Sequence, residues 1–408
     1  MKRLSFMLIA GEASGDTLAA ELVCALREEL AVFQSHPTPD QQPLWASLEP
    51  EFFGAGGPKM AAAGVKLAVD MTEHSVFGMI DVLKKYFQFR RLMDQLVRLA
   101  IERQPDVIVC VDFSGFNRRF ARAVKDHVRA RAGTFDHWNP RIIQFVSPQV
   151  WASRPGRAAA MARDYDLVLS IFPFEPAWYA EHAPQMRVKF VGHPMLDRYG
   201  KATGEKRQAE TPLVVLLPGS RVKELKRHLP VMVEVAKNIL ASQPVTLRMV
   251  LPSEELAETA RVFTASLPQI QTQVGGLAEA LSLAELAIAS SGTVTMECAF
   301  FGVPTVVLYK ISWPEFQIGK RIVRVKYIAM PNLLASELVF PEFIQDDATP
   351  DNLSRAALEF LQDGARREQT QVKLKQVIAS LGEPGASRRA AVAVVKLLTG
   401  PFNTPASS

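Results

Sequence analysis

Asp112 is the residue of this sequence best placed to act as an acid or base. It follows the five apolar residues 107–111, a run typical of a buried parallel strand. Ligands of open α/β sheets collect at the carboxyl ends of the strands, so the carboxylate is expected at the edge where a substrate would bind. The position is compatible with a general base, a ligand-binding group or a helix cap, and the sequence alone leaves these roles open.

Two strand-to-helix turns in the second half of the chain have the composition of an anion site. One is the turn in "LLPGSRVKEL" and the other is the turn in "ASSGTVTMECA". Backbone N–H groups and the helix dipole favour an anion at such helix starts. Helix capping by Ser or Thr explains either turn alone, but two such turns, one with an arginine, favour a bound diphosphate. The residues predicted to hold it are Gly219, Ser220, Arg221, Ser291, Gly292 and Thr293.

Glu297 lies about one helical turn after the second of these segments. A carboxylate behind a diphosphate site can accept hydrogen bonds from both hydroxyls of a ribose, as in dinucleotide-binding folds. A solvated glutamate on the helix surface is the alternative. Its apolar neighbours, among them Met296 and Cys298, make simple solvation less favourable.

The opening stretch "FMLIAGEASGDTLAAEL" predicts a strand, a tight turn and a helix. It lacks the glycine spacing of a dinucleotide fingerprint and the Gly-Lys-Ser/Thr of a phosphate loop. Glu12 and Asp16 add negative charge beside Gly11 and Gly15. A bare phosphate would be repelled here, so the nucleotide is expected elsewhere in the chain.

A loop after another strand, "FVSPQVWASRPGR", combines an aromatic side chain with two guanidinium groups. This combination suits sugar and phosphate recognition, although a structural tryptophan is the more common explanation. The candidates are Ser147, Gln149, Trp151, Arg154 and Arg157. The nearby pair Asp164 and Asp166 resembles a metal-binding motif of some sugar transferases, but it precedes its strand and is expected at the wrong end of the sheet.

The elements that position these residues read as two α/β domains. A chain of 408 residues is longer than a domain with a single hydrophobic core usually is. Short apolar runs alternate with helical patterns throughout the sequence. The fold class predicted is α/β, with two doubly wound Rossmann-like domains facing across a cleft. The expected divisions are a first domain at 1–197, a linker at 198–212, a second domain at 213–350 and a helical tail at 351–408. The strands expected in the first half are 4–10, 107–111, 141–146, 167–171 and 188–191.

The composition and net charge of the chain limit the kinds of partner that the protein is expected to bind. The chain is 48% hydrophobic and 22% charged, as in an ordinary globular protein, and its net charge of +5 indicates an anionic partner. Its three cysteines have no metal-ligand spacing and fit buried thiols in a reducing cytosol. No metal cluster is visible in the sequence, and no metal or cofactor is expected. Residues 286–309 are apolar but contain Glu297 and Pro304, which argues against a membrane span. Membrane contact is therefore expected to be peripheral.

The segment 75–99 is unusual because apolar and basic side chains surround its first half. Residues 89, 92, 93, 96 and 97 form a normal buried stripe. The earlier part, 76–91, suits an interfacial collar that contacts an anionic membrane, while a helix buried on several sides is the alternative. The collar's apolar residues are Val76, Phe77, Met79, Ile80, Val82, Leu83, Tyr86 and Phe87. A second basic run, from Arg118 to Arg131, lacks stacking aromatics, so no nucleic-acid partner is expected.

Taken together, the motifs resemble the lipid-A-disaccharide synthases. "GEASGD", "VSPQVWA" with "RPGR", "VGHPMLD", "LLPGSR", "SSGTVTMECAFFGVPTVV" and "MPNLLA" occur in that family's order across nearly the whole chain. The resemblance implies a two-domain GT-B glycosyltransferase, with the acceptor side in 1–197 and the UDP-sugar side in 213–350. It implies transfer of 2,3-diacylglucosamine from its UDP derivative to the 6-hydroxyl of 2,3-diacylglucosamine-1-phosphate, with inversion and without a metal. The implied location is the cytoplasmic side of the inner membrane of a Gram-negative bacterium.

The resemblance also assigns roles to individual residues. It implies Asp112 as the base, Arg221 and Glu297 in the UDP site, and Asn332 of "MPNLLA" in binding. It also implies a catalytic or acceptor-side role for the opening turn, with Glu12 and Ser14 as the candidates. Some family members carry a second acid where this chain has Gly115. An isomerase of the UDP-N-acetylglucosamine 2-epimerase type and an inactive UDP-sugar-binding protein are the alternatives, and the sequence leaves self-association into a homo-oligomer open.

Overall fold

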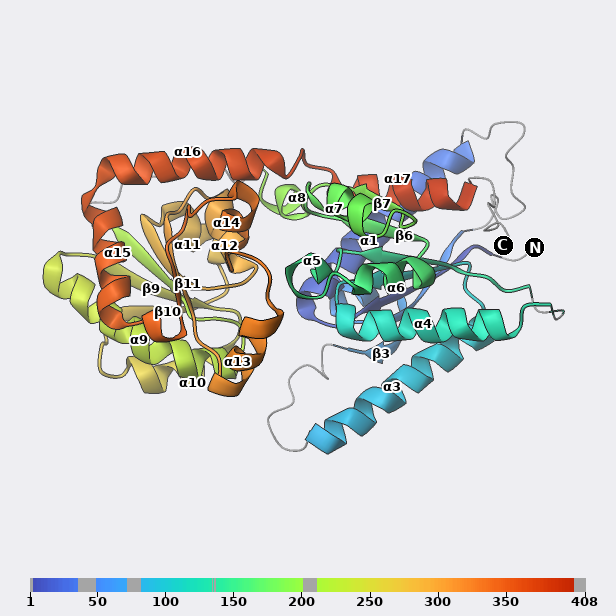
Figure 1. Cartoon of the computed structure of the whole chain (residues 1–408), viewed down its shortest axis with the longest axis horizontal. Coiled ribbons are helices and arrows are strands. Elements are labelled where there is room, and N and C mark those ends of the chain that lie inside the picture. The colour runs from blue at the N-terminus through green and yellow to red at the C-terminus, as the bar shows by residue number, and fades with distance from the viewer. Residues whose placement is uncertain are drawn as a thin grey trace. The chain divides into compact units, whose positions relative to one another are not determined.

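The computed structural model describes residues 3–35, 49–71, 82–133, 135, 137–200 and 211–399, without the side chains of 82–87. The chain forms two compact units (Figure 1). The first comprises Met1–Asp197 together with Glu383–Ser408, and the second comprises Arg198–Gly382. The segment expected as one helical tail is therefore shared between the two units.

The first unit contains a parallel sheet with, in its described part, seven strands in the order β3-β2-β1-β4-β5-β6-β7. The strands are β1 (Ser5–Ala10), β2 (Glu51–Gly56), β3 (Lys66–Asp70), β4 (Val107–Val111), β5 (Arg141–Phe145), β6 (Leu167–Ser170) and β7 (Val188–Phe190). The five strands expected from the sequence are confirmed. Two were missed: β2 contains two glycines, and β3 is a short edge strand without a buried run.

Helices cover both faces of this sheet. They are α1 (Ala13–Ser35), α2 (Pro58–Ala62), α3 (Val82–Arg103), α4 (Ser114–Ala130), α5 (Val150–Ser153), α6 (Arg157–Asp164), α7 (Glu175–His182), α8 (Met195–Tyr199) and α17 (Ala386–Thr399). The expected stripe of α3 is confirmed, because Leu96 is buried and Phe89, Leu92, Met93 and Val97 pack on the same core cluster. The range of α8 crosses the division between the two units.

The last helix, α17, belongs to the first unit because it packs along α1. Asp197 fixes its start by accepting hydrogen bonds from the backbone N–H groups of Gly385, Ala386 and Ser387. Arg389 donates to the carbonyl of Val191 at 2.7 Å. The motif "VGHPMLD", which contains Val191 and Asp197, therefore holds the returning end of the chain.

The second unit has a parallel sheet whose six strands in the described segments run in the order β10-β9-β8-β11-β12-β13. They are β8 (Leu213–Leu217), β9 (Thr246–Leu251), β10 (Ile270–Val274), β11 (Leu286–Ser290), β12 (Thr305–Tyr309) and β13 (Glu342–Ile344). Alternate residues of β8 belong to different core clusters: Val214 and Leu216 to one, Val215 and Leu217 to another. Both faces of the sheet are therefore buried, which explains the continuous apolar runs.

The helices of the second unit are α9 (Val222–Ser242), α10 (Glu254–Thr264), α11 (Leu277–Leu283), α12 (Val294–Phe300), α13 (Trp313–Ile322), α14 (Met330–Ala335), α15 (Pro350–Gln362) and α16 (Gly364–Ser380), with a short 3-10 helix at Gln345–Asp347. Two parallel-sheet α/β units confirm the predicted fold class.

Some predicted features lie outside the described residues. The collar residues Val76, Phe77, Met79 and Ile80 are among them, and so is most of the expected linker 198–212. The side chains of Val82, Leu83, Tyr86 and Phe87 are likewise not described. Among the helices that are described, none has the length and apolar content needed to cross a bilayer.

Candidate active site

Asp112 lies at the carboxyl end of β4 in a strained turn. Its φ is 46° and that of Phe113 is 41°, the left-handed region that side chains other than glycine rarely adopt. The Asp112 carbonyl accepts hydrogen bonds from Asn117 Nδ2 at 2.8 Å and Gln144 Nε2 at 3.1 Å, and its N–H donates to the Phe145 carbonyl at 2.9 Å. Such strain persists only when the surroundings fix the backbone, and it concentrates at functional sites.

The environment of Asp112 makes its carboxylate a stronger base than usual. Burial raises its pKa, and the negative charge of Glu12 raises it further, while a hydrogen bond from the Phe113 backbone opposes both effects. Glu12 and Ser14 are exposed at the start of α1. The structure thus brings Asp112 and Glu12 into one electrostatic environment, as expected if both belong to one site.

The opening turn has a packing role as well. A Cβ built on Gly11 would lie 2.3 Å from the Phe113 ring, so only glycine fits between the turn and Phe113. Asp16 accepts hydrogen bonds from the backbone N–H groups of Gly57, Lys59 and Met60 at 2.8–3.0 Å. Its carboxylate therefore caps α2, a role that sequence reasoning missed because β2 and α2 were not predicted.

The loop after β5 contains both buried and accessible candidates. Trp151 is buried and donates from Nε1 to Glu175 Oε1 at 3.0 Å, and Ser147 Oγ lies 3.1 Å from the Tyr179 hydroxyl. Burial raises the pKa of Glu175 to about 7. These contacts give Ser147 and Trp151 a structural role in shaping the loop, and the binding role of both residues stays a prediction.

Three other residues of this loop face outward. Gln149 and Arg154 are exposed, and Arg157 at the start of α6 is partly exposed. They keep the accessibility that the predicted recognition of sugar or phosphate requires.

In the second unit, the turn after β8 is organised by Glu224 of α9. Its Oε2 accepts from the Ser220 N–H at 2.9 Å, and its Oε1 lies 3.3 Å from Arg221 Nη1. A Cβ on Gly219 would approach Glu224 Oε2 to 2.4 Å, and the φ of Gly219 is 129°. The tight turn is confirmed. The Ser220 amide, however, is already satisfied by Glu224, so Arg221 is the group of this turn best suited to attract an anion.

His228, which sequence reasoning missed, fixes the same turn to the end of β12. Its Nδ1 lies 2.7 Å from the Pro218 carbonyl, and its Nε2 lies 3.1 Å from the Lys310 N–H. The ring must therefore donate through Nδ1–H and accept at Nε2. Burial lowers the pKa of His228, which favours this neutral form. The sequence feature that could have identified His228 is its position about two helical turns after the glycine turn, on the inward-facing side of α9.

The turn after β11 has open space above it. A Cβ on Gly292 would meet no atom within 4 Å. Thr293 is exposed, while Ser291 Oγ donates to the Ile328 carbonyl at 3.1 Å. Because α12 has only seven residues, its dipole contributes little, and accessible backbone at Gly292 is the main feature that suits an anion.

Glu297 is held by a residue that the sequence did not indicate. The Tyr199 hydroxyl donates to Glu297 Oε1 at 2.8 Å, and the Tyr199 ring packs on Phe300 and Phe301. Burial raises the pKa of Glu297, and the hydrogen bond from Tyr199 opposes this effect. The solvated alternative is therefore wrong for this glutamate.

Asn332 is fully buried and bonded within the protein. Its Oδ1 accepts from the backbone of Val339 and Phe340, and its Nδ2 donates to Glu342 Oε1 at 2.7 Å. Glu342 in turn accepts from the Ile328 N–H. Since the Ile328 carbonyl bonds Ser291, Asn332 supports the turn after β11 through a chain of hydrogen bonds. These hydrogen bonds give Asn332 a positioning role, and direct binding by this residue stays a prediction.

Two hollows in the described part of the chain are lined by none of the predicted site residues. One of about 450 Å³ is lined by residues of α10 and β10, including Arg261, and another of about 450 Å³ is lined by Ala68 and residues of α3, including Asp94. In the described part of the chain, no group of three or more His, Cys, Asp or Glu residues is arranged to hold a metal.

Solved structures with the same fold include glycosyltransferases and a UDP-N-acetylglucosamine 2-epimerase. The calicheamicin glycosyltransferase matches with a TM-score of 0.58 at 15% identity, covering 99% of this chain and 100% of that chain. A UDP-N-acetylglucosamine 2-epimerase from Neisseria meningitidis, solved with UDP-N-acetylglucosamine, matches with a TM-score of 0.59 at 12% identity, over 97% and 100%. At these identities the similarity shows the fold alone.

Curated sequences give a more specific result. Lipid-A-disaccharide synthase from Geobacter sulfurreducens is 34% identical over 402 residues, 96% of this chain and 97% of that protein. The enzyme of the same name from Pseudomonas aeruginosa is 34% identical over 406 residues, 97% and 98% of the two chains. The family model described as lipid-A-disaccharide synthetase matches residues 6–396. The chain therefore belongs to the lipid-A-disaccharide synthetase family, and it is a glycosyltransferase.

Proposed function

We propose that the protein transfers 2,3-diacylglucosamine from UDP-2,3-diacylglucosamine to the 6-hydroxyl of 2,3-diacylglucosamine-1-phosphate. The products are the β-1,6-linked disaccharide 1-phosphate and UDP. The observation that carries the proposal is Asp112, a partly buried carboxylate of raised pKa in a strained turn at the carboxyl end of β4. Family membership supplies the substrate class.

Asp112 acts as the general base in this proposal. It takes the proton of the acceptor 6-hydroxyl as that oxygen forms a bond to the anomeric carbon of the donor. The bond from the anomeric carbon to the diphosphate oxygen breaks at the same centre, and UDP leaves with the electron pair, so the configuration inverts. A positioned base typically contributes about 10²–10⁴-fold to the rate, and the raised pKa strengthens its affinity for the proton.

The second unit binds the donor in this proposal. Arg221 and the backbone at Gly292 and Thr293 compensate the charge that grows on the departing diphosphate. Glu297 accepts a hydrogen bond from the ribose through the oxygen that Tyr199 does not use. Arg221 supplies positive charge without a metal ion, so we propose a metal-independent reaction.

We also propose peripheral association with the cytoplasmic face of an anionic membrane, because both substrates carry acyl chains. This proposal rests on the sequence of the collar 76–91. Replacing Ile80, Val82, Leu83 and Phe87 by Ser should release the protein from membranes without loss of the fold. Unfolding of this variant would instead assign the four side chains to the core.

The decisive experiment incubates the purified full chain with both lipid substrates in mixed micelles. UDP and the disaccharide 1-phosphate should form in equal amounts, with unchanged rates in EDTA and a β linkage by NMR. UDP release without an acceptor, or retention of the anomeric configuration, would contradict the mechanism. Incubation with UDP-N-acetylglucosamine alone tests the isomerase, and appearance of the 2-epimer would contradict the proposal.

A further inference from the structure

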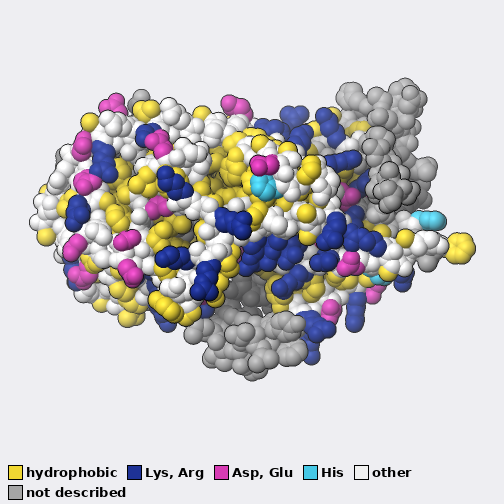
Figure 2. Space-filling model, viewed as in Figure 1, with side chains coloured by type: hydrophobic (Ala, Val, Ile, Leu, Met, Phe, Trp, Pro, Cys, Tyr) yellow, Lys and Arg dark blue, Asp and Glu magenta, His cyan; other side chains and the backbone are white. Residues whose placement is uncertain are grey.

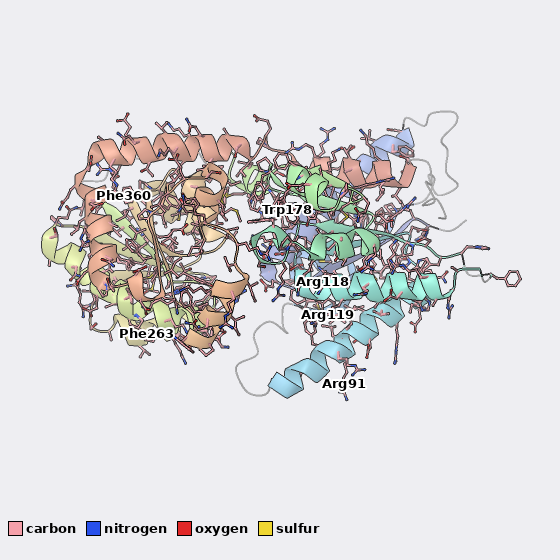
Figure 3. The ribbon with its side chains drawn as sticks, in the orientation of Figure 1. Arg91, Arg118, Arg119, Trp178, Phe263 and Phe360 are labelled. Carbon is pink, nitrogen blue, oxygen red and sulfur yellow. The ribbon has the colours of Figure 1, made fainter. Side chains whose placement is uncertain are left out.

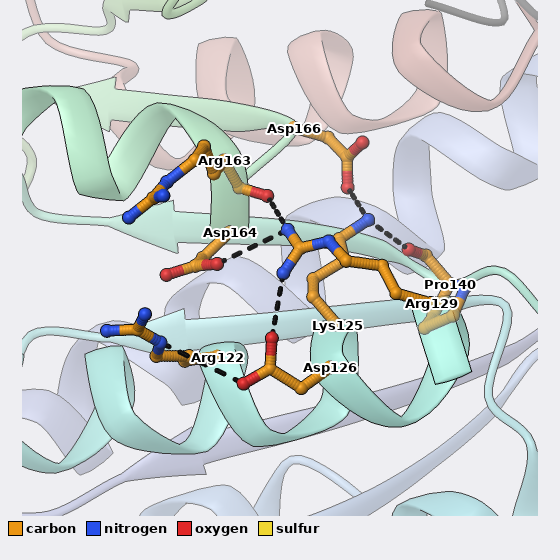
Figure 4. Close-up of polar contacts among 8 residues, drawn as sticks. All are labelled: Arg122, Lys125, Asp126, Arg129, Pro140, Arg163, Asp164 and Asp166. Atoms are coloured by element: carbon orange, nitrogen blue, oxygen red, sulfur yellow. Dashed lines mark hydrogen bonds and ion pairs between the residues drawn. The ribbon is translucent and has the colours of Figure 1, made fainter.

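Helices α4 and α6 of the first unit pack together, and the charges at their carboxyl ends are balanced. Figure 4 shows Arg129 of α4 bonded to Asp126 at 2.9 Å and paired with Asp164 at 3.5 Å. Lys125 pairs with Asp166 at 2.9 Å, beyond the end of α6. Arg129 and Lys125 each have a carboxylate partner, and these contacts explain how the two helices are fixed side by side.

The amino ends of the same two helices carry positive charge without such compensation. At these amino ends, four arginines of the described part of the chain form neither an ion pair nor a side-chain hydrogen bond. They are Arg118, Arg119, Arg154 and Arg157, which we call the arginine cluster. Arg122, one turn after Arg118, is the first cation of α4 with a partner, because it pairs with Asp126 at 3.8 Å.

Two observations place the members of the arginine cluster close together. Contacts between Arg129 and Asp164 set the register of the helices. Two turns back on each lie Arg122 and Arg157, and Arg118 lies one turn before Arg122 on α4. The pKa of Arg157 is lowered by partial burial and then by the positive charges of the other three members, which agrees with this placement.

The figures show the same grouping. Figure 3 places Arg118 and Arg119 toward the amino end of α4. Figure 2 shows basic side chains gathered on the face of the first unit that α4 and α6 cover.

The arginine cluster lies at the sheet edge that carries the proposed base. Arg118 is on the helix that begins directly after Asp112 and Phe113, about 9 Å along from Asp112 at 1.5 Å per residue. Arg154 follows the loop after β5, the strand next to β4. Because α4 starts at this edge and α6 runs in the same direction, both amino ends face the region where a substrate of Asp112 would bind.

We propose that the arginine cluster binds the 1-phosphate of the acceptor sugar, a phosphomonoester dianion. The inference rests on the proposed function and names the group that the acceptor presents. In that sugar, the carbon bearing the 6-hydroxymethyl group and the carbon bearing the phosphate are both attached to the ring oxygen. One bound ring can therefore present its hydroxyl to Asp112 and its phosphate to guanidinium groups nearby. Arginine binds phosphate through paired, charge-assisted hydrogen bonds.

The test compares two acceptors that differ only at the first carbon. Steady-state rates in micelles are measured with 2,3-diacylglucosamine-1-phosphate and with the analogue that has a free 1-hydroxyl. For the double variant Arg154→Gln/Arg157→Gln we expect KM for the phosphorylated acceptor to rise about 10- to 100-fold, from the loss of two charge-assisted hydrogen bonds. KM for the analogue and KM for the UDP donor should change less than about twofold, since neither uses the cluster.

Arg163→Gln is the matched control, because it removes an exposed cation at the opposite end of α6 from Arg157. Its KM for both acceptors should stay within about twofold of the original. If Arg154→Gln/Arg157→Gln impairs the two acceptors equally, the inference is overturned although the proposed function stands. Unchanged kinetics with both acceptors would overturn it as well.

A binding measurement separates this inference from the proposed reaction. Calorimetry should show that Arg154→Gln/Arg157→Gln binds 2,3-diacylglucosamine-1-phosphate at least about tenfold more weakly than the original protein does. If the variant binds this sugar phosphate more weakly but the original protein transfers no sugar, the phosphate site is supported and the proposed function is refuted. Sedimentation with vesicles of phosphatidylglycerol and phosphatidylcholine is the last arm. If the variant loses only vesicle binding and keeps its micellar KM, the cluster binds lipid headgroups and the inference is wrong.

Discussion

Tyr199 holds the carboxylate of Glu297 by a 2.8 Å hydrogen bond to Oε1, although the two residues are far apart in the sequence. The Tyr199 ring is fixed by Phe300 and Phe301 of the Glu297 segment. One carboxylate oxygen is therefore oriented by the protein, and the other remains to accept a hydrogen bond from a ligand. This arrangement gives the proposed ribose site a defined geometry before a nucleotide binds.

Glu297→Gln should weaken UDP binding about tenfold, because a hydrogen bond to a charged acceptor is worth about 1.5–3 kcal/mol. In the unaltered protein, affinity for UDP should fall as the pH drops through the raised pKa of Glu297. Tyr199→Phe removes the hydrogen bond that lowers this pKa, so the loss should begin at a higher pH. Calorimetry between pH 4.5 and 8 measures both effects, and equal UDP affinity of all three proteins would contradict the assignment.

Asp112→Asn should reduce kcat by about 10²–10⁴-fold while UDP still binds, since the base is removed and the donor site is not. Because Asp112 must be ionised to accept a proton, activity should be lost as pH falls through its raised pKa. Glu12→Gln removes a charge that raises this pKa, so the acid limb of kcat/KM should move to lower pH. An acid limb that stays in place or moves upward would show that Glu12 does not act on Asp112.

Gly11→Ala should disturb the Asp112 turn, because the added Cβ would lie 2.3 Å from the Phe113 ring. Overpacking of this kind costs about 1–3 kcal/mol, and the displaced ring should shift the base and lower kcat. Gly115→Ala is the control: it adds the same atom close by in α4, where nothing lies within 4 Å. Urea unfolding and steady-state kinetics should separate the two variants. Equal behaviour would show that Phe113 can move without consequence.

Glu175→Gln should alter how stability depends on pH. Burial raises the pKa of Glu175 to about 7 from an ordinary 4.5, so its contribution to stability is fully present below pH 4.5 and declines as pH rises to about 7. At about 1.4 kcal/mol per pH unit, the decline is on the order of 3 kcal/mol. The variant should lack it, since glutamine does not titrate. Urea unfolding at pH 5 and pH 8 measures the difference, and parallel pH profiles of the two proteins would refute this explanation.

Most of the fold could be predicted from the sequence because buried parallel strands consist of continuous apolar runs, as in Val107–Val111. The strands β2 and β3 escaped because glycine and partial exposure removed that signal. The position of Asp112 at a strand end was equally readable, since it follows from the strand alone. Its strained backbone was not, because Asn117 and Gln144 impose it from other elements.

The roles of several site residues depended on partners distant in the sequence. Nothing around Trp151 indicates Glu175, and nothing around Asn332 shows that its amide is consumed by the backbone of Val339 and Phe340. Sequence motifs therefore located loops at the carboxyl ends of strands. They could not separate the side chains that support a loop from those that face solvent, because burial is decided by tertiary packing.

The return of α17 to α1 has a practical consequence for dissecting the protein. A fragment that stopped at Asp197 would expose the surface of α1 that α17 covers, and Glu29 would lose its contact with Arg388. Cutting the chain at this boundary therefore produces an incomplete unit whose newly exposed surface on α1 is apolar. An autonomous amino-terminal half would have to be built by grafting the last helix onto it through an artificial tether.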